Sequence, residues 1–164
     1  MITVTDSTRL MRGTVRATWP DVRFSIRAGR GASTYAAVAW IDGPTVPQVY
    51  DRLRPYTHSP DNGARRNYLC ANVLPDRRYS DAAVTAMIRR LQHRNPGHPQ
   101  LADLDPVEIT ATDIHYGRLH TPADPDHNVH LDDHLVTTGS QTTVGRIVES
   151  ALRMSDLTPG RNDR

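Results

Sequence analysis

Apolar and polar residues alternate strictly along residues 22–27, VRFSIR. Successive side chains of a strand point to opposite faces, so this pattern predicts a β-strand with one buried and one exposed face. Phe24 and Ile26 would point into the core, and Arg23 and Arg27 would point to solvent. The alternation therefore predicts a strand that displays positive charge.

The strand is expected to continue into a hairpin. Residues 28–33, AGRGAS, contain two glycines that accept turn conformations, and residues 34–41, TYAAVAWI, predict the returning strand. The sequence DGPT at 42–45 ends it. Small residues on the returning strand would allow a helix to pack closely against the sheet.

Apolar residues at helical spacing predict four helices, and β-type runs predict two further strands. Asp6 or Ser7 is expected to cap the first helix. Thr45 and Gln48 have the spacing of a capping box at the second, and Ser80 is expected to cap the third. The predicted helices are residues 6–18, 45–54, 80–94 and 142–157, and the predicted strands are residues 67–74 and 106–114.

This order of elements predicts an α+β fold. We expect a small antiparallel sheet, made of the hairpin plus one or two further strands, with helices packed on one face. Residues 75–80, PDRRYS, are expected to form a turn. Residues 115–134 are rich in His, Asp and Pro and predict an irregular arm, and the tail 158–164 is expected to be disordered.

The charge is unevenly distributed along the 164 residues, whose net charge is +2. Residues 1–94 carry 15 arginines and 7 acidic residues, and residues 95–164 carry 5 arginines and 11 acidic residues. We therefore expect a basic α+β module at 1–94 and an acidic, His-rich extension at 95–164 within the same domain. The basic part would attract a polyanion, or the acidic part of its own chain within one molecule or between two.

Several pieces of the first half resemble a known family. These are WPDVRFSIR after the leading helix, VAWIDGPT, a following helix with the pattern V..V...L..Y, and RRYS at the start of a later helix. Together they resemble the large polyvalent protein-associated domain twenty-nine family over residues 5–92. The resemblance implies an accessory module of phages and conjugative elements. It implies no catalytic residues, because the family has no agreed activity.

Arginines are the candidate binding residues, since all 20 basic residues are arginine and the guanidinium fork suits phosphate and carboxylate groups. We expect those of the leading helix and the hairpin to gather on one outer surface. An acidic protein and a nucleic acid both remain open as partners, as does self-association through the oppositely charged halves. The candidates are Arg9, Arg12, Arg16, Arg23, Arg27, Arg30, Arg65, Arg66, Arg77 and Arg78.

The segment HNVHLDDH supplies candidate metal ligands in His127, His130 and His134. On a helix, His130 and His134 would share a face, as paired zinc ligands do. Zinc, nickel or manganese would suit imidazole and carboxylate ligands without thiolate. The alternative is a hydrophilic loop in which His and Asp are simply frequent.

Catalysis by a nucleophile has little support. Cys70 lies in a predicted strand, where a buried thiol is the usual case, and the glycine loop at 29–31 lacks the lysine of a phosphate-binding loop. We therefore expect a non-enzymatic accessory binding protein, with a metal-dependent enzyme as the weakest alternative. A single cysteine, no long apolar run and no signal-peptide pattern at the start lead us to expect a cytoplasmic protein.

Overall fold

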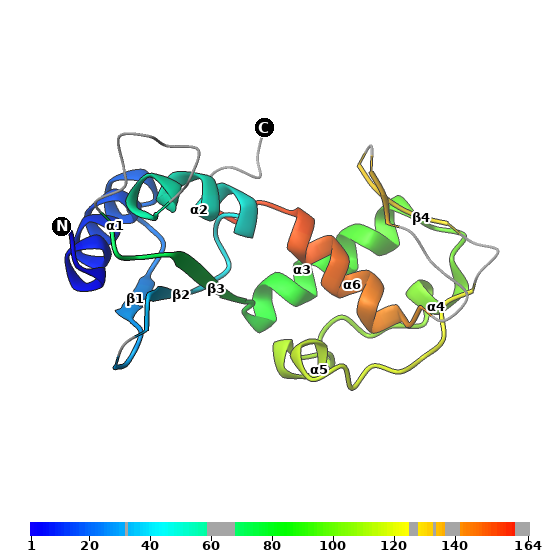
Figure 1. Cartoon of the computed structure of the whole chain (residues 1–164). Helices are drawn as coiled ribbons and strands as arrows, with labels where there is room; N and C mark the ends of the chain where they lie inside the picture. The colour runs from blue at the N-terminus through cyan, green and yellow to red at the C-terminus, as the bar shows by residue number, and fades with distance from the viewer. Residues whose placement is uncertain (32, 59–67, 125–127, 133, 137–141, 160–164) are drawn as a thin grey trace. The chain divides into compact units, whose positions relative to one another are not determined.

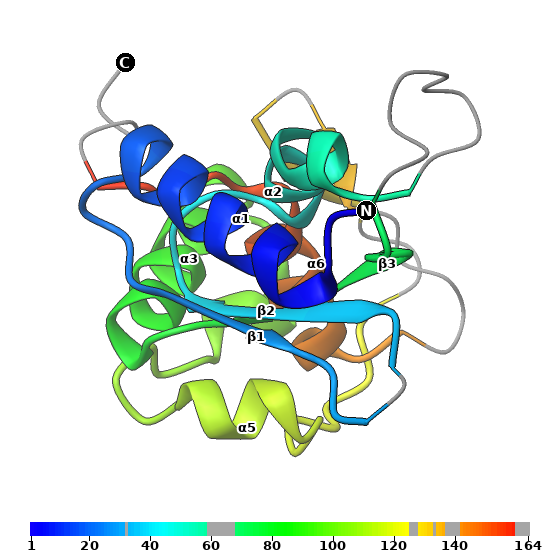
Figure 2. The same cartoon turned by 60° about the vertical axis from the view of Figure 1, so that its left-hand side comes forward.

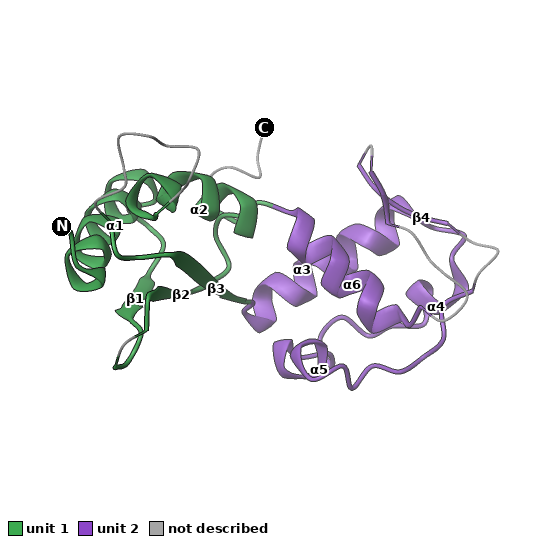
Figure 3. Cartoon of the chain, viewed as in Figure 1, with its two compact units in different colours: residues 1–78, 156–164 green, residues 79–155 purple. Residues whose placement is uncertain are grey.

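The computed structural model describes residues 1–164 except 32, 59–67, 125–127, 133, 137–141 and 160–164. The chain forms two compact units (Figure 3). Unit 1 comprises residues 1–78 and 156–164, and unit 2 comprises residues 79–155. From the sequence, unit 1 carries 14 arginines and 8 acidic residues, whereas unit 2 carries 6 and 10. The charge asymmetry therefore follows the two units.

Unit 1 is a three-stranded sheet with two helices on one face (Figures 1 and 2). Strands β1 and β2 are antiparallel and β3 is parallel to β2, in the order β1-β2-β3. The helices bury Met11, Val15, Val49 and Leu53 against the sheet. The elements are α1 (Val4–Thr18), β1 (Phe24–Ala28), β2 (Tyr35–Ile41), α2 (Val46–Leu53), the short 3-10 helix η1 (Arg54–Tyr56) and β3 (Asn72–Arg78).

Unit 2 is built on two packed helices, α3 and α6, whose apolar stripes face each other. A two-stranded antiparallel hairpin, β4-β5, packs beside them. Its buried residues include Ile88, Leu91, Ile147 and Leu152. The elements are α3 (Asp81–Arg94), α4 (Pro99–Ala102), α5 (Ala111–His115), β4 (Val129–Leu131), β5 (His134–Val136) and α6 (Val144–Met154).

The α+β fold class is confirmed, as are all four helices predicted from the sequence. Ser80 caps α3, and Thr45 and Gln48 form the capping box of α2. The first helix begins earlier than predicted, because Thr3 caps it and accepts a hydrogen bond from the Asp6 amide at 3.1 Å. Among the described residues, no helix is long and apolar enough to cross a membrane.

The third strand differs from the prediction in place and direction. It covers Asn72–Arg78 rather than 67–74, and it pairs parallel to β2, so the sheet is mixed rather than antiparallel. The segment predicted as a turn therefore forms most of the strand. Its residues are mostly exposed because β3 is an edge strand, and an exposed polar edge strand containing Pro75 has the composition of a turn.

The strand predicted at 106–114 is wrong. Thr110 and Asp113 instead form a capping box that starts the short helix α5. Only Ile114 of this stretch is buried, and Val107 is 71% exposed. The apparent alternation therefore has no buried face to support a strand.

The division between the two parts also falls earlier than the expected boundary at residue 94. Helix α3 lies in unit 2, because Val84, Met87, Ile88 and Leu91 are buried in the unit that contains α6. Residues 156–158 return to unit 1, where the Leu157 amide donates to the Gly43 carbonyl at 2.8 Å. The part of the tail at 160–164 lies outside the described residues.

A tight corner at residues 40–45 connects β2 to α2. Asp42 and Gly43 both have positive φ, of 55° and 67°. The Trp40 indole N–H donates to the Pro44 carbonyl at 3.0 Å, and Thr45 then caps α2. The motif W-x-D-G-P-T therefore encodes a structural corner.

We predict that Gly43→Ala destabilises unit 1 by about 2–4 kcal/mol. A Cβ at this φ is strained, and it would lie 2.9 Å from Val22 Cγ2. Both tryptophans belong to unit 1, so denaturation followed by tryptophan fluorescence reports on this unit. Gly13→Ala is the control: it has nothing within 4 Å of the added Cβ and lies in helix α1, so it should stabilise by about 0.5–1 kcal/mol. Equal stability of the Gly43 variant and the native protein would contradict this account of the corner.

A second prediction concerns Asp132 at the tip of the β4-β5 hairpin. Its carboxylate accepts a hydrogen bond from Arg90 and lies 3.6 Å from the Arg94 guanidinium, and the hydrogen bond from Arg90 is the main cause that lowers the pKa of Asp132. A carboxyl group whose pKa is lowered by folding stabilises the fold at pH values above its pKa in the unfolded state. This contribution is lost as the pH falls through its pKa in the folded state. Asn tolerates the positive φ of this position, so Asp132→Asn tests the charge.

At pH 7 the Asp132→Asn variant should show faster amide hydrogen exchange in β4 and β5 than the native protein. The difference should start to shrink as the pH falls below about 4, the ordinary pKa of an aspartate. It should disappear once the pH is below the lowered pKa of the native carboxylate. Glu149→Gln, which removes the ion pair with Arg153 on α6, is the control and should leave the hairpin unchanged. A difference that persists unchanged at low pH would show that the charge of Asp132 is not responsible.

Candidate binding surface

One face of the unit 1 sheet is covered by α1 and α2, and no helix or strand from the described part of unit 1 lies on the other face (Figures 1 and 2). Ile26, Val38 and Trp40 point into the covered face and are at most 3% exposed. Their neighbours along the strands must point the opposite way. The uncovered face is therefore built from the alternate residues of the same strands.

Strand register arranges these outward residues in rows. Arg27 lies opposite Ala37, which lies opposite Leu74. In the next row Ser25, Ala39 and Asp76 are aligned, and Ile41 is aligned with Arg78 at the end of the sheet. Small side chains thus occupy the middle of the face, with longer ones on both sides.

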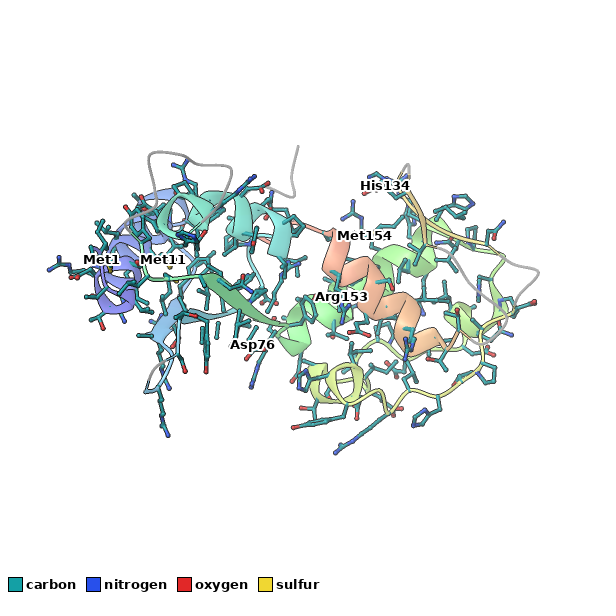
Figure 4. All side chains as sticks on the ribbon, viewed as in Figure 1. Met1, Met11, Asp76, His134, Arg153 and Met154 are labelled. Carbon is teal, nitrogen blue, oxygen red and sulfur yellow. The ribbon has the colours of Figure 1, made fainter. Side chains whose placement is uncertain are left out.

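An open depression of about 520 Å³ follows this arrangement. Ala37 and Ala39 form its floor, and Ile41, which is 60% exposed, lies at one end. Figure 4 shows Asp76 on the same side of the sheet. We call this surface the open sheet face and define it by Arg23, Arg27, Ala37, Ala39, Ile41 and Arg78.

The cations of the open sheet face differ in their partners. Arg78 forms an ion pair with Asp76, with 3.2 Å between Nη2 and Oδ2. The guanidinium groups of Arg23 and Arg27 form no hydrogen bond or ion pair with any residue that the structure describes. Arg27 lies on β1 and Arg23 directly precedes it, so two guanidinium groups along this side of the sheet are available to an external carboxylate.

Arg12 has a structural role that its helical spacing does not reveal. Its Nε and Nη2 atoms donate to the Ile26 carbonyl at 3.2 and 2.6 Å. Ile26 lies on β1, an edge strand of the sheet, so this carbonyl would otherwise be open to another strand. Arg12 therefore ties α1 to the sheet and closes part of its edge.

The opposite edge of the sheet is also protected. The Val73 amide donates to the Asn72 side chain at 2.8 Å, and Pro75 has no amide hydrogen to offer. Both positions lie on β3, the other edge strand. At these positions the sheet cannot extend by adding a strand in the ordinary way.

The other candidate arginines lie elsewhere. Arg9 pairs with Asp6 and borders a separate depression between α1 and α2, on the helix side of the sheet. Arg16 is exposed on α1, and Arg30 is at the turn of the β1-β2 hairpin. Arg77 donates to the Gly43 carbonyl at 2.8 Å and so supports the corner.

The expectation of one common arginine surface is therefore wrong. Arg9 and Arg16 lie on α1, on the helix side of the sheet, whereas Arg23 and Arg27 point away from the helices. Alternation along residues 23–27 places Arg23 and Arg27 on the face opposite the buried residues against which α1 packs. Arg65 and Arg66 lie outside the described residues.

The candidate metal ligands do not lie on a helix. His130 is on β4 and His134 is on β5, near the tip of the hairpin (Figure 4). In the hairpin register His130 pairs with Leu135, and His134 pairs with Leu131, so the two imidazoles are on opposite faces. His127 lies outside the described residues. No group of three possible ligands occurs among the residues that can be described.

Cys70 is fully buried, as the sequence predicted, although it precedes β3 rather than lying within a strand. Burial is the main cause that raises the pKa of its thiol. A buried thiol with a raised pKa is a poor nucleophile. Trp19 and Trp40 are core residues, and Phe24 lies between them with ring centroids 5.8 and 5.6 Å away.

The sequence analysis missed the small residues at the centre of the open sheet face. The small residues of the returning strand were expected to receive a helix, without distinguishing its two faces; Ala36 does face the helices, whereas Ala37 and Ala39 face away from them. The signal was present, because Phe24 and Ile26 fix the buried face of β1. If the alternating residues of β2 are aligned with the buried face of β1, Ala37 and Ala39 fall on the exposed face of the sheet.

We predict that Arg12→Ala lowers the stability of unit 1 by about 1.5–3 kcal/mol, since it removes a charged donor from a partly buried carbonyl. Chemical denaturation followed by tryptophan fluorescence measures this change. Arg16→Ala removes an exposed arginine from the same helix and should change the stability by no more than about 0.5 kcal/mol. Equal effects of the two substitutions would refute the structural role of Arg12.

Comparison with known proteins gives a family match for the first part of the chain. Residues 2–74 match the family model described as large polyvalent protein associated domain 29. The match ends within β3, so it excludes RRYS and α3, which the sequence analysis had included. No curated protein and no solved structure matches the chain. The similarity to the large polyvalent protein associated domain 29 family therefore covers residues 2–74, which form most of unit 1.

Proposed function

We propose that the chain is a non-enzymatic accessory binding protein of a mobile genetic element, and that unit 1 engages an acidic protein partner through the open sheet face. The observation that carries the proposal is the pair of guanidinium groups of Arg23, directly before β1, and Arg27, on β1, beside an exposed floor of small and apolar side chains. Apolar contact area bordered by charge is typical of protein interfaces. The family supports an accessory role.

The distribution of arginines favours a protein partner over a nucleic acid. A surface that follows a phosphate backbone needs several cations along one stripe. Here Arg12 and Arg77 donate to backbone carbonyls, and Arg78 pairs with Asp76. Arg9 and Arg16 lie on α1, on the opposite side of the sheet from Arg23 and Arg27. Two cations next to an apolar floor suit a segment with carboxylate and apolar side chains.

The proposal assigns binding rather than catalysis to the chain. Cys70 is buried, and burial raises the pKa of its thiol, which supports a structural role for the one cysteine. The two described histidines of the hairpin face in opposite directions, which supports a hydrophilic surface there rather than a metal centre. A cytoplasmic location and self-association through oppositely charged parts stay predictions of the sequence.

The proposal can be tested by NMR, by titrating the isotope-labelled 164-residue chain with poly-L-glutamate. The amides of β1 and β2 and the Nε–H groups of Arg23 and Arg27 should shift, because the carboxylates bind beside the open sheet face. The signals of Arg9 and Arg16 on α1 should change little. A short random-sequence duplex DNA serves as the competing ligand.

Charge reversal provides the matched comparison. Arg27→Glu should weaken poly-L-glutamate binding at least tenfold, which corresponds to about 1.4 kcal/mol, whereas Arg16→Glu changes the net charge equally and should weaken it much less. Equal losses in the two variants would indicate attraction by net charge alone and would contradict the proposal. Tighter binding of the duplex at the same residues would favour the nucleic-acid alternative.

A further inference from the structure

We infer that the occupant of the open sheet face is a single amphipathic helix of the partner, with acidic residues along one flank. This inference rests on the proposed function and adds the shape of the bound segment. The alternatives are an extended strand, a nucleic-acid backbone and a second copy of this chain. Three features of the described residues favour the helix.

The first feature is the floor. Ala37 and Ala39 stand in the central strand, and the longer side chains of Arg27 and Leu74 flank Ala37 in the same row. Leu74 is 45% exposed and Ile41 is 60% exposed, although both are apolar. A trough with small residues in its centre and larger ones on both sides lets a helix approach the sheet closely and covers those apolar groups.

The second feature is the state of the sheet edges. A bound strand normally adds to a sheet through free backbone groups of an edge strand. At β1 the Ile26 carbonyl is taken by Arg12, and at β3 the Val73 amide is taken by Asn72, followed by Pro75. The edges are therefore poor acceptors of a strand, whereas the face is open.

The third feature is the spacing of the available charges. Arg23 and Arg27 are four residues apart along one edge of the face, which corresponds to about 13 Å at 3.3 Å per residue. Two turns of helix advance about 11 Å. A helix aligned with the strands would therefore meet both guanidinium groups with carboxylates at positions i and i+7 or i+8. Strands β2 and β3 have 7 residues each, or about 23 Å, which matches about 15 helical residues.

Synthetic peptides test the shape of the occupant. The helical probe is a fluorescent peptide of about 15 residues, with leucines at i, i+3, i+4 and i+7 and two glutamates spaced by seven along one flank. The strand probe has the same composition with leucine and glutamate alternating. Both are titrated into the full chain by fluorescence anisotropy, and a random duplex DNA is titrated in parallel.

The helical probe should bind at least tenfold more tightly than the strand probe. Arg23→Glu and Arg27→Glu should each weaken its binding at least tenfold, and Ala39→Gln should weaken it by filling the floor without changing the charge. Arg16→Glu, on the helix side of the sheet, should leave the affinity within about twofold. Tryptophan fluorescence melting confirms that unit 1 is folded in each variant, because both tryptophans lie there.

Equal or tighter binding of the strand probe would overturn the helical occupant while leaving the open sheet face as the site. Equal losses in all charge variants, or tighter binding of the duplex, would overturn the proposed function as well. Sedimentation of the chain alone measures its oligomeric state and so tests the remaining alternative, a second copy of this chain. Self-association that Ala39→Gln abolishes would assign the face to a second copy and would overturn the inference.

Discussion

The Gly43 carbonyl is the point on which the structure of unit 1 depends. It accepts hydrogen bonds from the Arg77 guanidinium on β3 and from the Leu157 amide of the returning chain, both at 2.8 Å. Three segments that are distant in sequence thus meet at one backbone group. The positive φ values of Asp42 and Gly43 turn that group toward its partners and direct the chain from β2 into α2.

The same corner determines what the sheet can bind. Because α2 starts directly after it, α2 packs on the face that contains Ile26, Val38 and Trp40, which α1 also covers. The other face is left with Ala37 and Ala39 in its centre and with Arg23 and Arg27 at its side. Residues 2–74, which match the family model, therefore include the residues that build this fold. The exposed surface of the sheet is a consequence of that fold.

Arginine serves three different purposes in this chain, although its side chain is the same throughout. Arg12 and Arg77 saturate backbone carbonyls, Arg90 and Arg94 hold the hairpin of unit 2 through Asp132, and Arg23 and Arg27 have no partner within the described residues. A guanidinium offers five donors in a plane, which suits all three uses. Counting arginines along the sequence therefore overestimates the charge available for binding.

The sequence by itself determined the four longer helices α1, α2, α3 and α6, the caps of α2 and α3 and the two faces of β1, because each depends on residues that are close together in the sequence. Thr45 with Gln48, and the alternation at 22–27, are examples. Tertiary structure alone decided the parallel pairing of β3, the use of Arg12 and the side of the sheet that stays open. Those outcomes depend on contacts across the chain, such as the 14 residues between Arg12 and Ile26 or the 34 between Gly43 and Arg77, and local periodicity contains no information about them.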